Sequence, residues 1–322
     1  MITRRTAIAT AIALGAPDIV GRAQAQDDYP SKQINIILGF APGGGADSST
    51  RWIADYVRDK WKVPTVVENR AGAGATIAAT ALARAKPDGY TIGLVTTTGY
   101  TIAPYFQSVP YSPDKDFTYL FQFLVSSEAM FCRADAPYKT APELIAWAKA
   151  NPGKLNWSSG ATNGAAQIAT EMAFRHAGIT AQYIPFKGGA DAMPALLGGH
   201  IDILVAAGYV PLVESGRIRL LAESGLEKIA NFEQIPTYKE LGWPIGVQAY
   251  YGLAAPAGLP APIAAKWEAL GKQMVTDPGF TELMKKLSNK ASFRTGPEFA
   301  RFVADGYKQM GELIPLLGLK PS

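Results

Sequence analysis

From residue 33 onward the chain alternates between short apolar runs and longer stretches with the apolar period of a helix. This alternation is typical of an α/β protein with largely parallel sheets. At ~150 residues per domain, 322 residues suffice for about two domains. The expected strands are Ile34–Phe40, Thr65–Glu68, Thr91–Thr97, Phe117–Val125, Ala129–Arg133, Leu155–Ser158, Gln182–Pro185, Ile201–Ala206, Ile218–Glu223 and Gln248–Ala254. The expected helices are Asp47–Trp61, Gly74–Ala85, Ala141–Asn151, Gly164–Ala177, Asp191–Gly198, Ala261–Thr276, Gly279–Leu287 and Pro297–Leu316.

The first residues have the features of an export signal. Arg4 and Arg5 precede a short apolar stretch, Thr6–Ala16, and Ala23–Ala25 forms an A-x-A site, so we expect cleavage after Ala25. Both the Sec and the twin-arginine route remain open, and the alternative is an ordinary N-terminal helix. No later stretch reaches 18 uninterrupted apolar residues, so we expect a soluble mature protein outside the inner membrane.

Composition argues against several functions. The net charge of +4 is too small and scattered to indicate nucleic-acid binding. Cys132 is the single cysteine, so no internal disulfide can form, and its apolar surroundings predict a buried strand residue. With His176 and His200 as the two histidines, we expect neither a histidine-rich metal site nor a histidine-based catalytic centre. We place His176 at a helix end and His200 in a loop, and expect no cofactor.

A glycine-rich loop follows the first expected strand. Gly43, Gly44 and Gly45 allow a ligand to approach the backbone, and Asp47 or Ser48 is a suitable N-cap for the next helix. The helix N-terminus would present free N–H groups to an anion. The segment is neither a dinucleotide fingerprint nor a P-loop, because Ser48 replaces the last glycine and no Gly-Lys-Ser/Thr follows. The alternative is a connector without a ligand.

Two further loops have a similar layout. In the loop 156–164, Ser159, Thr162 and Asn163 are candidates to hydrogen-bond a carboxylate, and the alternative is that Ser158, Ser159 and Thr162 are plain caps. No G-x-S-x-G motif surrounds the serines, so a nucleophile elbow is not indicated. In the loop 185–190, Lys187 is a candidate to attract an anion, or a solvated surface charge.

Loops of this kind without an acid/base pair favour binding over catalysis. Aromatic residues near them are candidates to wall an apolar ligand, although such residues more often belong to the core. They are Phe40, Tyr100, Trp157, Tyr209 and Tyr250.

The chain resembles the Bug-type substrate-binding receptors of tripartite tricarboxylate transporter systems across residues 29–322. The resemblance is carried by motifs in the family's order, after an export signal. They are Phe40–Asp47, Val67–Gly74, Pro87–Tyr90, Asp116–Phe117, Asn151–Asn156, Pro185–Gly188, Leu197–Asp202, Ile235–Thr237 and Tyr251–Gly258.

The resemblance implies a two-domain α/β fold of the type II-like periplasmic-binding-protein class, with a ligand cleft between the domains. Residues 26–127 and 251–322 would form domain 1, and residues 128–250 domain 2, with crossings near Glu128 and Tyr250. It also implies a periplasmic monomer that binds a small carboxylate and delivers it to a permease with one large and one small membrane subunit.

By position, the resemblance implies contacts from five loops. The first two loops would contribute Phe40, Ala41, Gly43, Gly44, Gly45, Ala46 and Asp47, and Ser159, Gly160, Ala161, Thr162 and Asn163. The remaining candidates are Thr97, Thr98 and Tyr100 after the third strand, Lys187 and Gly188, and Ala207 and Tyr209.

The chain departs from the family pattern at several of these positions. Ala161 and Asn163 stand near glycine positions, and Gln167 replaces a histidine. Ala206 and Ala207 stand where the family often has an Asp-Asn or Asp-Ser pair, which removes a partner for a ligand ammonium. We therefore expect an apolar or aromatic carboxylate rather than an amino acid. Alternative functions are a receptor that signals to a sensor partner and a secreted α/β enzyme.

Overall fold

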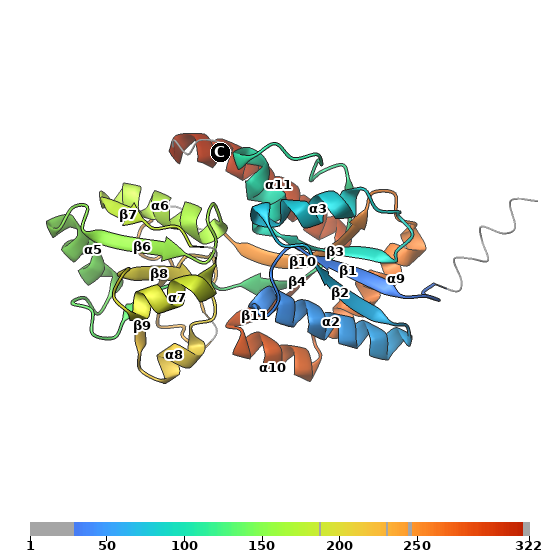
Figure 1. Ribbon diagram of the computed structural model, residues 1–322, viewed down its shortest axis with the longest axis horizontal. Helices are drawn as coiled ribbons and strands as arrows, with labels where there is room; N and C mark the ends of the chain where they lie inside the picture. Colours follow the sequence, from blue (N-terminus) through green and yellow to red (C-terminus); the bar gives the residue numbers. More distant parts are fainter. Residues whose placement is uncertain (1–28, 187, 230, 244–246, 318–322) are drawn as a thin grey trace, which may run out of the picture.

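The computed structural model describes residues 29–186, 188–229, 231–243 and 247–317, which form two lobes, each built on one sheet (Figure 1). The first lobe contains a six-stranded sheet in the order β11-β4-β10-β3-β1-β2. Its strands are β1 (Ile34–Leu38), β2 (Thr65–Asn69), β3 (Thr91–Thr96), β4 (Phe117–Ser126), β10 (Ala249–Pro256) and β11 (Asn289–Thr295). Its helices are α2 (Gly45–Trp61), η1 (Ala73–Ala75), α3 (Thr76–Ala83), η2 (Thr98–Ile102), α4 (Ala103–Phe106), α9 (Ala261–Met274), α10 (Pro278–Lys286) and α11 (Gly296–Leu317).

The second lobe contains a five-stranded sheet in the order β7-β6-β8-β5-β9. Its strands are β5 (Ala129–Arg133), β6 (Leu155–Ser159), β7 (Ala181–Tyr183), β8 (Ile203–Ala206) and β9 (Ile218–Glu223). Its helices are α5 (Ala141–Ala150), α6 (Ala165–Ala177), α7 (Gly189–Leu197) and α8 (Val210–Glu214). Thr140 is the N-cap of α5, because its Oγ1 accepts the Glu143 N–H at 3.3 Å, and the Glu143 carboxylate accepts the Lys139 N–H at 2.7 Å.

The expectation of largely parallel sheets is wrong, because both sheets are mixed. In the first lobe β1 is parallel to β2 and β3, whereas β10 is antiparallel to β3 and β4, and β11 to β4. In the second lobe β6 is parallel to β7 and β8, whereas β5 is antiparallel to β8 and β9. The reason is how the chain connects the lobes. β5 and β10 each enter their sheet from the other lobe and run away from the junction, whereas the strands beside them run toward the junction.

The chain passes from the first sheet to the second between Ser126 and Ala129, and returns between Glu223 and Ala249. Figure 1 shows β4 and β10 extending toward the second lobe. The six-stranded sheet therefore combines the beginning and the end of the chain, and the five-stranded sheet uses the middle. The division into domains at 127/128 and 250/251 stays a prediction.

Each sheet carries apolar side chains on both faces. In the first lobe, Ile36 of β1 packs with Ile53 of α2 and Trp267 of α9, whereas Val95 of β3 packs with Leu82 of α3 on the other face. In β8 of the second lobe, alternate residues face opposite layers, because the side chains of a strand alternate across its sheet. Ile203 and Val205 belong to the core cluster of α5 and α6, and Leu204 and Ala206 to that of α7.

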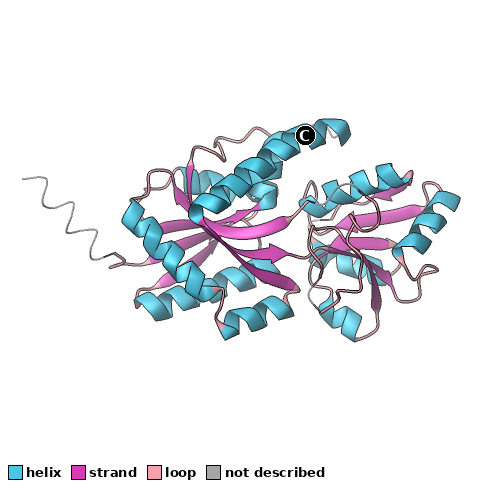
Figure 2. Cartoon of the chain, turned by 180° about the vertical axis from the view of Figure 1, so that it is seen from behind, coloured by secondary structure: helices cyan, strands magenta, loops and turns pink. Residues whose placement is uncertain are grey.

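The last helix packs against both lobes, and Figure 2 shows it running from the first lobe toward the second. Phe299 and Val303, near the start of α11, pack in the core of the first lobe. Met310 and Ile314 lie in the cluster that holds the core of the second lobe, together with Ile102 and Phe106. The helix therefore ties the two lobes together.

Most expected elements are present with ends shifted by a few residues, and some elements are additional. Ala129–Arg133 and Ile218–Glu223 form strands with the predicted ends. β11 was not expected because Asn289–Thr295 is largely polar and lacks an apolar run, as suits a strand at the edge of a sheet. The helical turns η2, α4 and α8 were also not expected.

The export signal and its cleavage site lie outside the described residues. Within the ranges given above, no helix is both long and apolar enough to span a membrane.

Candidate functional site

The strand registers bring the predicted ligand loops to one junction between the lobes. β10 enters the first sheet from the second lobe, and Tyr251 near its start pairs with Thr96 at the end of β3, so the carboxyl ends of β3 and its parallel neighbour β1 face the junction. At the start of β5, Ala129 pairs with Ala206, so the carboxyl ends of β8 and its parallel neighbour β6 face it too. Ligands of open α/β sheets bind at such carboxyl ends.

The first loop is organised by Asp47. Its carboxylate accepts the Gly43 N–H at 3.0 Å, the Arg51 Nε–H at 2.9 Å and the Asn69 side-chain amide at 2.9 Å. Hydrogen bonding by Arg51, with smaller contributions from Asn69 and Gly43, lowers the pKa of Asp47 to about 2. The prediction that Asp47 or Ser48 is the N-cap is wrong, because the N-cap is Gly44 and Asp47 lies buried in the first turn, where it holds the loop instead.

The glycines of this loop present backbone to the junction. Ala41, Gly43, Gly44 and Gly45 are exposed, whereas Ala46 is buried and Phe40 is partly exposed. Gly44 has φ −85°, which any residue adopts, and a Cβ atom there would meet no atom within 4 Å. Because Gly44 has no side chain, nothing at this position covers the backbone N–H groups at the start of α2.

The loops of the second lobe converge on Gly160. Its N–H donates to Val205 O at 2.9 Å, and a Cβ added there would lie 3.3 Å from the Ala206 Cβ. A Cβ on Gly188 would lie 3.9 Å from Gly160 O, and one on Gly189 3.7 Å from Gly160 Cα. The structure therefore brings together the predicted residues Gly160, Gly188 and the end of β8, next to partly exposed Ala207. Lys187 lies outside the described residues.

Polar side chains of the second loop bond within the lobe. Ser159 is fully buried, donates from Oγ to Ala161 O at 2.9 Å and lies 3.0 Å from the Tyr183 hydroxyl. Thr162 is exposed and donates to Phe186 O at 3.4 Å. Asn163 donates its N–H to Gln167 Oε1 at 2.7 Å, so the residue at the family's histidine position closes the loop onto α6.

Other predicted contacts lie in the core or support the junction. Thr97 is buried, donates from Oγ1 to Gln248 O at 3.2 Å and accepts the Tyr250 N–H at 3.0 Å, whereas Thr98 beside it is partly exposed. The Tyr100 side chain is 1% exposed and packs in the aromatic core of the first lobe, because η2 turns it inward. Tyr209 is also buried, and its hydroxyl lies 2.7 Å from Ser127 Oγ.

Two carboxylates at the junction were not identified as candidate site residues. Glu223 accepts the Ser127 hydroxyl at 2.5 Å, the Gly225 N–H at 2.9 Å and the Glu128 N–H at 3.2 Å. Burial raises the pKa of Glu223 to about 6. Burial and the nearby Glu223 charge raise the pKa of Glu128 to about 7, although Glu128 accepts the backbone N–H of Ala166 in the first turn of α6. The sequence held one signal for this pair, since Glu128 is a charged residue at the expected crossing between apolar strands.

Glu128 lies between the two sets of ligand loops. Its Oε1 would be 3.9 Å from a Cβ added to Gly160 of the second lobe. Tyr251 of β10 is partly exposed, and burial of its hydroxyl together with the Glu128 charge raises the pKa of that phenol. The Tyr251 ring lies 6.4 Å from the ring of Phe40, the first residue of the glycine-rich loop. Phe40, Tyr251 and Glu128 therefore connect the glycine-rich loop with the N-terminus of α6.

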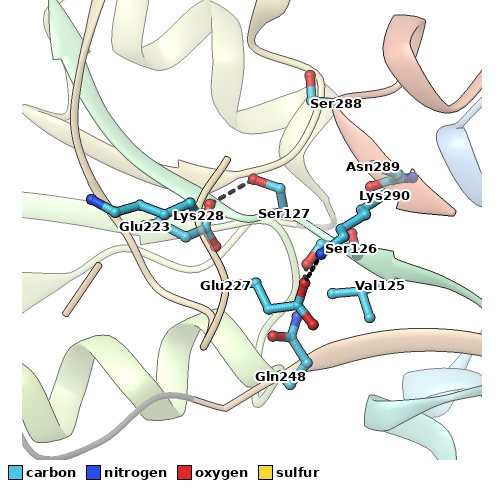
Figure 3. A pocket seen from close by; sticks show the side chains of 10 residues that line it. All are labelled: Val125, Ser126, Ser127, Glu223, Glu227, Lys228, Gln248, Ser288, Asn289 and Lys290. Atoms are coloured by element: carbon cyan, nitrogen blue, oxygen red, sulfur yellow. Dashed lines mark hydrogen bonds and ion pairs between the residues drawn. The ribbon is translucent and has the colours of Figure 1, made fainter. Parts of the chain in front are cut away.

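A separate small hollow adjoins Glu223 (Figure 3). Its volume is about 10 Å³, roughly the space for one water molecule, and it is lined by the ends of β4 and β9 and the start of β11. Lys290 of β11 and Glu227 after β9 form an ion pair of 2.5 Å across it, and Ser127 points toward Glu223. The hollow lies where the chain segments cross between lobes, and its ion pair connects them.

The described residues offer little catalytic chemistry. No cluster of three histidine, cysteine or acidic residues suited to a metal ion occurs within the described part of the chain. Cys132 is buried in β5 as predicted, and burial raises the pKa of its thiol to about 11. Trp157 and Tyr250 are core residues. The arrangement suits holding a small molecule on backbone groups.

Comparisons with known proteins match this arrangement. The model of a protein family described as "Tripartite tricarboxylate transporter family receptor" matches residues 49–319 of this chain. The "UPF0065 protein in gbd 5'region" of Cupriavidus necator is 34% identical over 319 residues, 99% of this chain and 97% of that protein. The periplasmic binding protein BugD has a TM-score of 0.80 and 29% identity over 91% of this chain and 99% of its own. MatC from Rhodopseudomonas palustris with bound malate has a TM-score of 0.77 and 25% identity over 89% of this chain and 100% of MatC.

Proposed function

The chain belongs to the tripartite tricarboxylate transporter receptor family, and from this membership we propose that it captures a small carboxylate between its lobes for a membrane permease. The resemblance to Bug-type receptors and the two-domain α/β fold class are confirmed by the family match and by the likeness to BugD. The proposed permease has one large and one small membrane subunit, and the proposed receptor acts as a periplasmic monomer after export.

One observation carries the proposal. The carboxyl ends of β1, β3, β6 and β8, from two different sheets, meet at one junction. The loops after β1 and β6 each lead into a helix of more than three turns, α2 and α6, whose N–H groups suit an anion. The ligand site proposed here comprises Phe40–Asp47 and Thr98 of the first lobe with Gly160–Asn163, Gly188 and Ala207 of the second.

The proposed mechanism is closure of the lobes around the anion. When both lobes contact the same carboxylate, the closed state binds it more tightly than the open state, and the ligand shifts the equilibrium by that difference in affinity. Movement would occur at the crossing 126–129, which joins β4 to β5, and where β9 ends and β10 begins at the junction. The malate bound to MatC, a structural neighbour of this chain, supports a small carboxylate as the ligand.

A binding function agrees better with the loops than catalysis does. Ser159, the serine best placed to act as a nucleophile, is fully buried and donates its hydroxyl proton to a backbone carbonyl. Neither histidine lies in the proposed ligand loops. The family's solved relatives are binding proteins, and we assign no reaction to this chain.

A thermal-shift screen of residues 26–322 against mono-, di- and tricarboxylates, aromatic acids and amino acids tests the proposal. A ligand at 100 times its dissociation constant adds about 2.7 kcal/mol to the free energy of unfolding. We expect one class of acid to raise the melting temperature. If no acid raises the melting temperature, and calorimetry also detects no binding, the small-carboxylate function is contradicted, whereas the fold and the family assignment stand.

A further inference from the structure

Glu128 is an acidic side chain beside the proposed ligand site, since its Oε1 would lie 3.9 Å from a Cβ added to Gly160. It belongs to neither set of predicted loops, because it lies in the crossing between β4 and β5. Its carboxylate lies near Gly160 and the Ala166 N–H, and its charge also acts on the Tyr251 hydroxyl of β10. The residue is not fully covered by protein, so part of its surface remains accessible at the junction.

The described groups around Glu128 include no cation that balances its charge. The charged group that acts on it is Glu223, whose own carboxylate is occupied by Ser127, Gly225 and the Glu128 N–H. The phenols of Tyr251 and Tyr238 also feel its charge. One backbone N–H, that of Ala166, bonds to Glu128, whereas an ionised carboxylate has lone pairs for about four hydrogen bonds.

We propose that Glu128 is the specificity-determining residue of this site, and that the ligand is a carboxylate that also bears a protonated nitrogen, whose N–H groups Glu128 accepts. The inference rests on the proposed carboxylate-receptor function and names the class of carboxylate. It replaces the expectation of an apolar or aromatic acid, which was drawn from Ala206 and Ala207. The acidic partner for an ammonium is present, but it comes from the crossing instead of the loop after β8.

Charge balance favours this class of ligand. A ligand with two carboxylates would place an anion beside Glu128, and like charges in a partly buried site repel strongly. A ligand with one carboxylate and one ammonium can place its carboxylate on the exposed Gly43–Gly45 backbone and its ammonium on Glu128. The pKa of Glu128, raised to about 7, agrees with a carboxylate that lacks a cation in the free protein.

The test uses pairs of acids that differ by the ammonium group alone. They are L-aspartate and succinate, 4-aminobutanoate and butanoate, and L-phenylalanine and 3-phenylpropanoate. Dissociation constants are measured by calorimetry at pH 7 for the parent, for Glu128→Gln and for Glu171→Gln. Glu171 is the matched control, because it is a partly buried glutamate of α6 whose pKa burial also raises.

We expect the parent and Glu171→Gln to bind an ammonium-bearing member at least tenfold more tightly than its partner, and Glu128→Gln to lose this preference. Binding should also release protons from the parent at pH 7, because a ligand cation ionises Glu128. Proton release is obtained from the binding heats measured in buffers of different ionisation enthalpy. If Glu128→Gln does not fold, proton release by the parent protein alone tests the role of Glu128.

Two results would overturn the inference and leave the carboxylate receptor standing. They are equal or tighter binding of the member without nitrogen, and proton uptake instead of release on binding. If no acid of any pair or of the wider screen binds the parent, the proposed function itself fails, and this inference fails with it.

Discussion

At the scale of single residues, Asp47 converts a glycine-rich connector into a defined loop. Its carboxylate gathers donors from Gly43, Arg51 and Asn69, which come from the loop, from α2 and from the end of β2. Each donor favours the ionised form, which is why the pKa of Asp47 falls to about 2. Since the pKa is lower in the folded state, the interaction stabilises the protein above about pH 4, and this contribution is lost as the pH falls toward 2.

Asp47→Asn tests this role. We expect the free energy of unfolding to drop by about 1–2 kcal/mol at pH 7, because the neutral amide cannot replace a charge-assisted partner of Arg51. The difference from the parent should shrink as the pH falls below about 4. Urea unfolding at pH 7, 5 and 3 measures it. Asp55→Asn on the same helix is the control, because its ion pair with Arg58 is exposed and contributes about 0.5 kcal/mol or less. An unchanged difference between pH 7 and pH 3 would contradict the assignment.

Gly44 tests the ligand site at the same scale. Its φ of −85° and the empty space around a Cβ predict that Gly44→Val folds normally, with a loss of about 1 kcal/mol or less in unfolding free energy because valine is a poorer N-cap than glycine. The isopropyl group would obstruct approach to the first turn of α2, so we expect the dissociation constant for the acid found by screening to rise at least tenfold. Ala150→Val, at the exposed end of α5, adds similar bulk elsewhere and should bind like the parent. Parent-like binding by Gly44→Val would remove this loop from the site.

At the scale of elements, glycines decide how closely helices approach the sheets. Gly271 of α9 lies directly over Phe121 of β4, and an added Cβ would be 2.6 Å from two ring atoms. The Phe121 ring is itself fully buried and cannot move aside freely. The absence of a side chain at Gly271 therefore sets the distance between α9 and the first sheet.

Gly271→Ala should lower the free energy of unfolding by about 1–2 kcal/mol. Overpacking of about 1–3 kcal/mol outweighs the gain of about 1 kcal/mol in helix propensity. Gly306→Ala in α11 is the matched control, since its Cβ would lie 3.4 Å from Thr101 Cγ2, and we expect it to be neutral or stabilising. Chemical denaturation of both variants gives the comparison. A stabilised Gly271→Ala protein would show that α9 shifts to make room.

At the scale of the whole molecule, the lobes are joined by more than the crossings of the chain. The ion pair Lys290–Glu227 links β11 to the segment after β9, and Arg175 of α6 donates to Leu316 O at 3.3 Å. The apolar contact is larger, because Met310 and Ile314 of α11 are buried in the core of the second lobe. The second lobe therefore depends on a helix that begins on the first.

Ile314→Ala should destabilise the protein by about 2–4 kcal/mol, within the range for deletion of buried aliphatic groups. Leu316→Ala, two residues away but 72% exposed, should cost less than about 0.5 kcal/mol. Denaturation followed by tryptophan fluorescence reports on both lobes, since Trp157 lies in the second and Trp267 in the first. Equal effects of the two substitutions would exclude α11 as a bridge between the lobes.

The sequence by itself determined the fold class, most of the elements and the family. Apolar periodicity in Ile34–Leu38 or Ala165–Ala177 is a local property, and burial of one face is enough to select a strand or a helix. The motifs around the glycine-rich loop predicted the family correctly for the same reason, because the residues that form each loop are consecutive in the sequence. Periodicity could not reveal β11, whose polar residues are stabilised as an edge strand by pairing with β4.

Only the tertiary structure decided which predicted residues meet and which polar groups are already satisfied. Tyr100 and Tyr209 stand beside ligand loops in the sequence, yet both are buried in cores. The carboxyl ends of the two sheets face one junction because β5 and β10 enter from the opposite lobe, which reverses their direction relative to their neighbours. The same crossing brings Glu128 near Glu223, 95 residues away in the chain. Burial and charge at such a point depend on every segment that surrounds it, and no local pattern encodes them.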